Sequence, residues 1–307
     1  MKSLFFLILI CLSIPVLAQE KTTVPIVAYW SKGDTLNFKI FKKIEKINDG
    51  KESQDSTTYY SQFIILDSTE TSYQILWKND FKQQISSLPF NLSDPIQSLQ
   101  DINYIYSTNE LGQFQSLDNW QEIATNLKNY LSLILQKLPT SDSVENSAFK
   151  NSMNQFLEIY TSKEGLESLV MREIRLLHST FGAEYLLGDT IRYEEQVNNA
   201  IDNSPMNINN EIFLSEIDEE NYNCIIVQNS FVSEEEMKSM ITSFAEKLKL
   251  PFDEAFKDFQ IDNNEKRVFS IDYNYGIPNY IYNKKTNKVK VKEQTGYRID
   301  TIEIELL

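Results

Sequence analysis

The sequence predicts an α+β fold: a curved antiparallel β-sheet, built from two related β-units, with helices packed on one face and a helical insert in the middle. Three observations lead to this prediction. The stretch 30–38, an aromatic residue followed by Gly-Asp-Thr and a second aromatic, recurs at 185–193, as expected for a duplicated unit. Residues after the first copy alternate between apolar and polar, the period of a half-buried strand, and a strand-like hairpin follows the second copy. Between the copies, apolar residues recur at helical spacing.

The first β-unit covers 19–116. Leu36, Phe38 and Ile40 alternate with polar residues, and the turn-forming residues 48–50 end that strand. Two strands rich in Tyr, Phe, Ile and Trp follow at 59–67 and 73–78. Their composition and the polar turn between them predict a β-hairpin.

The helical segment covers 117–183. A first helix is predicted from Leu117 to Leu138 and a second over 144–160. A third is predicted to start at Thr161, where Glu164 completes a capping box, and Gly182 is placed to end it.

The second β-unit covers 184–307. A hairpin is predicted over 212–228, and a helix over 234–259. Beyond it, 267–307 alternates with turn residues between the runs, which predicts a β-meander.

Residues 1–18 have the features of a secretory signal peptide: a basic start, a short apolar run and small residues before the cleavage point. A mature chain of 19–307 is then predicted to be one globular domain, exported to the periplasm or the extracellular medium, without a transmembrane segment. Ile10 stands where a lipoprotein signal has a small residue before Cys11, so a lipid anchor is not expected. Cys224 remains as the one cysteine after cleavage, which excludes an intramolecular disulfide and suggests a buried, inert thiol.

The formal net charge of −15 argues against nucleic acid or anionic membranes as partners. One concentration of basic residues stands against this background, and we interpret it as a structural feature that faces acidic residues of the closing strand or protects a sheet edge. Its members are Lys284, Lys285, Lys288, Lys290 and Lys292.

Motifs of known catalytic chemistry are missing from the sequence, so no catalytic residue, cofactor or metal site is predicted, and the expectation leans away from an enzyme. The two repeated aspartates, Asp34 and Asp189, are turn residues that could instead form a catalytic carboxylate pair. His178, the one histidine, is expected to complement a helix C-terminus as a cation. The acidic stretch 262–265 is interpreted as a turn between helix and strand rather than as a calcium loop.

Aromatic residues are the remaining indication of function, because the chain has 16 Tyr, 18 Phe and 3 Trp. Core packing accounts for most of them. One group surrounds the break at 276–278 and could line the mouth of an apolar cavity. The predicted ligand-binding residues are therefore Tyr273, Tyr275, Tyr280 and Tyr282.

The chain resembles uncharacterised signal-peptide-bearing secreted or periplasmic proteins of Gram-negative bacteria. The resemblance lies in the signal peptide, the aromatic-x-x-Gly-Asp-Thr strand entry and a strand that ends near Tyr-Gly-Ile-Pro at 275–278. More loosely, the order strands, helices, strands is similar to the lipoprotein-carrier (LolA/LppX-like) fold, a curved sheet partly covered by helices. That resemblance implies the fold alone.

The leading functional hypothesis is a non-catalytic envelope protein that binds an apolar or amphipathic ligand, such as a lipid, between sheet and helices. The first alternative is a structural or interaction protein that docks an envelope partner through the helical segment. The second alternative is a carboxylate-dependent hydrolase that uses Asp34 and Asp189.

Overall fold

A computed structural model describes residues 22–48, 50–79, 103–137, 161–198, 205–247, 259–291 and 294–307. The expected signal peptide at 1–18 and the expected helix at 144–160 lie outside these ranges.

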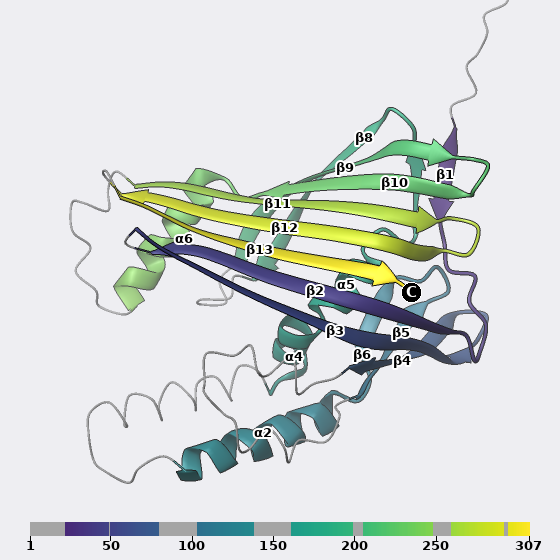
Figure 1. Ribbon diagram of the computed structural model, residues 1–307, viewed down its shortest axis with the longest axis horizontal. Helices are drawn as coiled ribbons and strands as arrows, with labels where there is room; N and C mark the ends of the chain where they lie inside the picture. Colours follow the sequence, from purple (N-terminus) through teal and green to yellow (C-terminus); the bar gives the residue numbers. More distant parts are fainter. Residues whose placement is uncertain are drawn as a thin grey trace, which may run out of the picture.

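One antiparallel sheet of 11 strands dominates the described part of the chain (Figure 1). Its order is β6-β5-β4-β3-β2-β13-β12-β11-β10-β9-β8. The strands are β2 (Thr35–Asn48), β3 (Lys51–Ser68), β4 (Ser72–Asn79), β5 (Asn103–Asn109), β6 (Phe114–Leu117), β8 (Thr190–Asn198), β9 (Pro205–Asp218), β10 (Asn223–Phe231), β11 (Phe259–Asp272), β12 (Ile277–Val291) and β13 (Gln294–Leu306).

The two predicted β-units join edge to edge in this single sheet. The last strand, β13, pairs with β2 from Leu306↔Phe38 to Tyr297↔Ile47, so the first and the last strand that the chain contributes to this sheet meet in its middle. Each unit is a meander, and both run in the same direction across the sheet, one starting at β2 and the other at β8.

A second, two-stranded sheet links the starts of the two units. It pairs β1 (Thr23–Ile26) with β7 (Ala183–Leu186), the strands that precede the two Gly-Asp-Thr stretches. Gly33 and Gly188 have positive φ of 94° and 81°, which an L side chain adopts only with strain. The repeated stretches are therefore equivalent turns that lead into β2 and β8.

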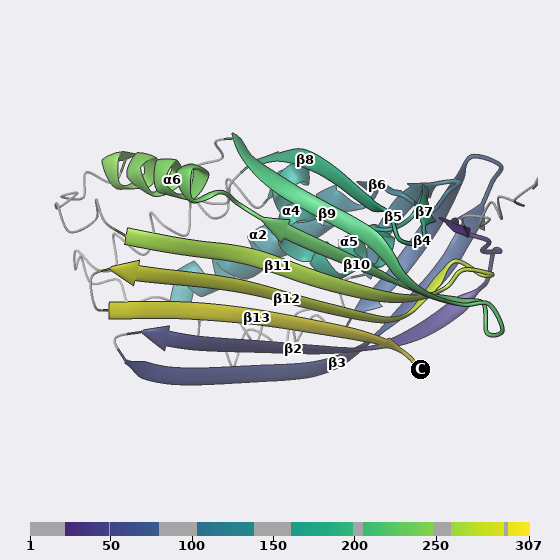
Figure 2. The same cartoon turned by 90° about the horizontal axis from the view of Figure 1, so that it is seen from above.

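The helices lie on one side of the large sheet, and Figure 2 shows its outer strands curving toward that same side. They are α2 (Trp120–Lys137), α4 (Lys163–Val170), α5 (Arg172–His178) and α6 (Glu234–Lys247). Ser162, one residue after the predicted cap, accepts a hydrogen bond from Gly165 N and begins α4. Among the described residues, no helix is both long and apolar enough to cross a membrane.

The main core fills the space between this concave face and the helices. Ile40, Ile281 and Ile304 are each at most 1% exposed, and they lie opposite one another on β2, β12 and β13. Aromatic residues of β2, β3, β4 and β5 complete the core, among them Phe38, Tyr59, Trp77, Tyr104 and Tyr106.

The predicted α+β class is wrong, because the described residues are mostly β and form one large sheet with four helices. The helical periodicity of 117–183 corresponds to α2, α4 and α5, but the strands of the sheet are unusually long, such as the 18 residues of β3, and outnumber the helices. The helix predicted over 234–259 is α6 in its first part, but Phe259 already begins β11. Residues 262–265, expected to form a turn, lie inside β11.

Candidate functional site

Side chains on the concave face change character along the strands. Directly opposite residues of paired strands point to the same side, so the strand register defines rows across the sheet. One row is fully apolar and buried: Leu214, Ile226, Phe269, Ile281, Ile304 and Ile40. Two residues further along each strand, the same face becomes polar on β10, β11 and β12. This polar region, together with polar residues of β8 and β9, is called the polar belt and comprises Tyr193, Asn210, Gln228, Ser230, Glu265, Arg267, Asn283 and Lys285.

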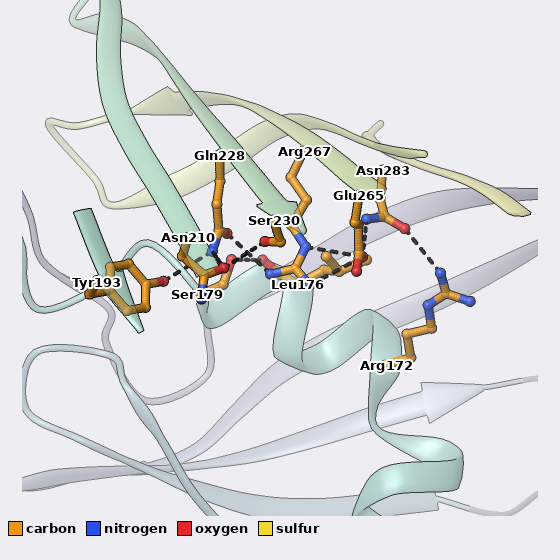
Figure 3. Close-up of polar contacts among 10 residues, drawn as sticks. All are labelled: Arg172, Leu176, Ser179, Tyr193, Asn210, Gln228, Ser230, Glu265, Arg267 and Asn283. Carbon is orange, nitrogen blue, oxygen red and sulfur yellow. Dashed lines mark hydrogen bonds and ion pairs between the residues drawn. The ribbon is translucent and has the colours of Figure 1, made fainter. Parts of the chain in front are cut away.

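Hydrogen bonds connect the belt across five strands, from β8 to β12 (Figure 3). Gln228 Nε2 donates to Tyr193 Oη at 3.0 Å and to Asn210 Oδ1 at 3.2 Å. Ser230 Oγ donates to the same Asn210 oxygen at 2.6 Å. Arg267 Nη1 donates to Gln228 Oε1 at 3.1 Å, so the chain of bonds continues from β10 to β11. A connected network of this kind supplies hydrogen-bond partners to buried polar groups, which would destabilise the fold if they were left unpaired.

Glu265 is the carboxylate at the centre of the belt. Its Oε1 lies 3.1 Å from Arg267 Nη2 and also accepts a hydrogen bond from Asn283 Nδ2. Burial alone would raise the pKa of Glu265, but Arg267, Lys285, the Asn283 bond and Arg172 together hold that pKa below its usual value. Glu265 is therefore ionised at neutral pH.

Helix α5 is anchored to this face through its first two residues. Arg172 Nη2 donates to Asn283 Oδ1 at 3.1 Å and so extends the network from the sheet to the helix. Glu173, whose side chain is 5% exposed, forms an ion pair with Lys42 of β2. The first turn of α5 thus reaches two strands, β12 and β2, that lie on either side of β13.

The belt together with Arg172 of α5 carries an excess of positive charge. Arg172, Arg267 and Lys285 surround the single carboxylate of Glu265, which leaves two positive charges unbalanced. The neighbouring charges cancel in pairs, Lys42 with Glu173 and Arg298 with Asp300. Within the described ranges, neither Arg172 nor Lys285 has a carboxylate within 4.0 Å. This is unusual for a chain of net charge −15.

A second, smaller apolar group lies beyond the belt, under α6. We call it the α6 cluster: Met206, Val232, Met237, Met240 and Ile261. Ile261 is four residues from Glu265 on β11 and points to the same face, so the two are about 13 Å apart along the strand. Three of the five residues are methionines, whose unbranched side chains adapt to irregular partners.

The four tyrosines predicted to bind ligand do not converge on one site. Tyr273 lies just after β11 and packs, partly buried, against the main core, where its ring meets Tyr222. Tyr275 is in the β11–β12 turn and 57% exposed. Tyr280 and Tyr282 flank the buried Ile281 and therefore point to the opposite face of the sheet, where Tyr280 Oη donates to Glu303. Their role in binding stays a prediction.

Asp34 and Asp189 are likewise not brought together. Asp34 accepts a hydrogen bond from Ser31 N at 2.7 Å, and Asp189 accepts one from Thr190 N at 2.8 Å. Both carboxylates thus stabilise their own exposed turns, and five strands separate β2 from β8 in the sheet. The arrangement favours the structural interpretation of the repeated aspartates.

His178 ends α5, as expected, but it is buried and uncharged rather than a cation. Its Nδ1 donates to the Gly112 carbonyl at 2.7 Å, which leaves Nε2 to accept from Tyr106 Oη at 2.9 Å. Burial lowers the pKa of His178 to about 4. Its ring packs against Trp30, Phe63 and Phe181, so it belongs to the core.

Cys224 is buried, and burial raises the pKa of its thiol to about 12, in agreement with the expected inert role. In the part of the chain that the structure describes, no group of three or more acidic, histidine or cysteine side chains is placed to hold a metal ion.

The polar belt was missed by sequence reasoning. The signal is a change from apolar to polar residues at every second position of a strand, that is, on one face of it. Examples are Ile281, Asn283 and Lys285 on β12 and Phe269, Arg267 and Glu265 on β11. In a single strand this pattern only indicates the end of a buried stretch. It becomes a continuous belt only once the strand register places the switches side by side. Lys285, grouped by sequence with four other lysines, lies on the concave face with Glu265 of β11 and Asp300 of the closing strand β13 as its direct partners, so for this residue the expected position opposite an acidic residue of the closing strand is confirmed.

No protein-family model matches the chain, and no curated protein is similar to it. Among solved structures, the chain is similar to a loop L8 deletion mutant of OmpT, an outer membrane protein of Vibrio cholerae. That match has 7% identity, covers 90% of this chain and 100% of the other, and has a TM-score of 0.21. A likeness of this size carries no argument about fold or function, so the functional proposal rests on the concave face alone.

Proposed function

We propose that this protein is a non-catalytic binding protein of the cell envelope whose ligand is an amphipathic molecule held on the concave face. One observation carries the proposal: the hydrogen-bonded polar belt and the apolar α6 cluster lie on the same face, about 13 Å apart along β11. This separation suits a molecule with a polar head and an alkyl tail, because one leaflet's share of a bilayer hydrocarbon core is about 15 Å.

The chemistry of the face supports binding rather than catalysis. The donors and acceptors of the belt bond to one another in an ordered network, and the methionines beneath α6 supply an adaptable apolar surface. The alternative hydrolase needs two carboxylates that act together, whereas Asp34 and Asp189 are each bound within a separate turn.

The test begins with purified mature protein mixed with a lipid extract of cell envelopes, separated again and analysed by mass spectrometry. We expect the protein to retain an amphipathic lipid. The Met240→Asp variant should lose it, because a carboxylate in the α6 cluster excludes an alkyl tail. Thermal unfolding of each variant verifies that it is folded.

Tyr275→Ser is the matched control, since Tyr275 is exposed at the other end of β11 and β12. It should retain the lipid as the wild type does. Absence of any retained lipid would contradict the proposal. Loss of lipid in Tyr275→Ser with full retention in Met240→Asp would move the ligand to the tyrosine group and also overturn it.

A further inference from the structure

We infer that the head group of the ligand is an anion, a phosphate or a carboxylate, and that Arg172 and Lys285 bind it on the concave face. This inference rests on the proposed amphipathic ligand and names the chemistry of its head.

The first step is the charge of the site. Three cations share one carboxylate, and that carboxylate is engaged by Arg267 and Asn283. Like charges in a partly desolvated region repel one another, and an added anion relieves that repulsion. A chain of net charge −15 has an abundance of carboxylates, yet the two others that adjoin these cations are already paired: Asp300, opposite Lys285 on β13, with Arg298, and Glu173, next to Arg172, with Lys42.

The second step is the number of donors left for a ligand. An arginine has five N–H donors, and toward the described residues Arg172 uses one of its nitrogens, Nη2, which donates to Asn283 Oδ1. A lysine ammonium has three donors, and Lys285 donates to no other residue in the described ranges. Both side chains are partly exposed, so a ligand can reach them.

The third step is how the two cations are positioned. Asn283, with no exposed surface, donates to Glu265 through Nδ2 and accepts from Arg172 through Oδ1. The amide therefore holds the Arg172 guanidinium at a set position relative to Glu265, which lies directly opposite Lys285. Arginine and lysine presented together from a helix and a strand form a strong, charge-assisted binding site for phosphate or carboxylate oxygens.

The experiment measures binding of three probes by isothermal titration calorimetry. Dodecyl phosphate has the alkyl chain and an anionic head, dodecyl maltoside has the same chain and a neutral head, and inorganic phosphate has no chain. We expect dodecyl phosphate to bind at least about tenfold more tightly than either of the other probes. Its affinity should decrease with added salt, while the affinity of dodecyl maltoside should not.

Arg172→Gln and Lys285→Gln should each lower the affinity for dodecyl phosphate about tenfold and leave the affinity for dodecyl maltoside unchanged. Lys285→Arg should retain most of the affinity. Lys284→Gln is the matched control, because it removes the same charge from the neighbouring residue, whose side chain points to the opposite face. It should bind all three probes as the wild type does.

The outcomes separate this inference from the proposed function. Equal affinity for both dodecyl probes, unaffected by the charge variants, would overturn the anionic head group and leave the amphipathic ligand standing. Inorganic phosphate that binds as tightly as dodecyl phosphate would overturn the proposed function instead, because the site would then recognise a free anion. If no probe binds, both fail.

Discussion

The indole Nε1 of Trp30 donates a hydrogen bond to the carbonyl oxygen of Gly276 at 3.1 Å, across 246 residues of sequence. This bond fastens the segment between β1 and β2 to the turn between β11 and β12. Gly276 has a φ of 63° and lies so close to the chain that a Cβ added to it would overlap the carbonyl oxygen of Val27. Trp30 itself is 7% exposed and packs against Phe63, Tyr73 and His178.

Gly276→Ala is therefore expected to lower the free energy of unfolding by about 2 kcal/mol or more, from a strained positive φ and a backbone clash together. Gly33→Ala is the control, because Gly33 also has a positive φ, of 94°, but open space around its Cβ position. Gly33→Ala should lower the free energy of unfolding by only about 1 kcal/mol. Urea denaturation of both variants measures the difference, and equal losses would show that the contact with Val27 is unimportant.

Glu265→Gln should destabilise the fold, because it leaves Arg267, Arg172 and Lys285 around a neutral amide. We expect a loss of about 3 kcal/mol at neutral pH, typical of a broken, mostly buried ion pair. Glu305→Gln, which removes a carboxylate that is 52% exposed in its pair with Lys39, should change the free energy of unfolding by less than about 0.5 kcal/mol.

The Glu265 contribution should also depend on pH in a defined direction. The pKa of Glu265 is held below its usual value of 4.5 in the folded protein, so its stabilising effect is complete above that value and is lost as the pH falls through the lowered pKa. The difference between wild type and Glu265→Gln should therefore narrow only in acid, below about pH 4.5. A difference that stays constant through this range would mean that the charge of Glu265 contributes nothing.

Local patterns were sufficient to predict many strands and turns but not the way they assemble. The alternation around Phe38 and Ile40 and the turn positions of Asp34 and Asp189 in the repeated Gly-Asp-Thr stretches were predicted from residues that are close in sequence. The pairing of β13 with β2 was not, because it joins residues more than 250 positions apart, such as Phe38 and Leu306. Without that pairing, the two β-units could not be recognised as one sheet.

The candidate site was hidden for the same reason. Gln228, Arg267 and Asn283 each look like ordinary polar residues near a strand end, and they become one network only when the strands are in register. The interpretation of His178 was wrong in charge, because position at a helix end does not reveal that aromatic residues from β3, β5 and the segment before β2 enclose the ring.

Ile304→Ala tests whether the last strand is as central to stability as it is to topology. Ile304 is 1% exposed and lies between Ile281 and Ile40 in the apolar row, so its truncation should cost about 2 to 5 kcal/mol. Leu307→Ala, at a residue that is 66% exposed, should cost less than about 0.5 kcal/mol. Similar denaturation midpoints for the two variants would indicate that β13 contributes little to the cooperative core.

His178 provides the clearest pH test, because it is the one histidine of the chain. Its pKa is lowered to about 4 by burial, whereas in the unfolded chain it is about 6.5. The folded protein thus favours the neutral imidazole, and this contribution is complete above about pH 6.5 and is lost as the pH falls toward about 4. At neutral pH, the lowered pKa of His178 contributes roughly 3 kcal/mol to the pH-dependent part of the free energy of unfolding.

Proton NMR of the imidazole measures this directly. We expect its resonances to stay constant from about pH 8 to about pH 5 in the folded protein and to titrate near about 6.5 in urea. His178→Gln, which cannot gain a proton, should lose the part of the pH dependence of unfolding that lies between about pH 6.5 and about pH 4. A folded-state titration near the unfolded value would contradict the assignment, because it would require an imidazole that accepts a proton without breaking its bond with Tyr106.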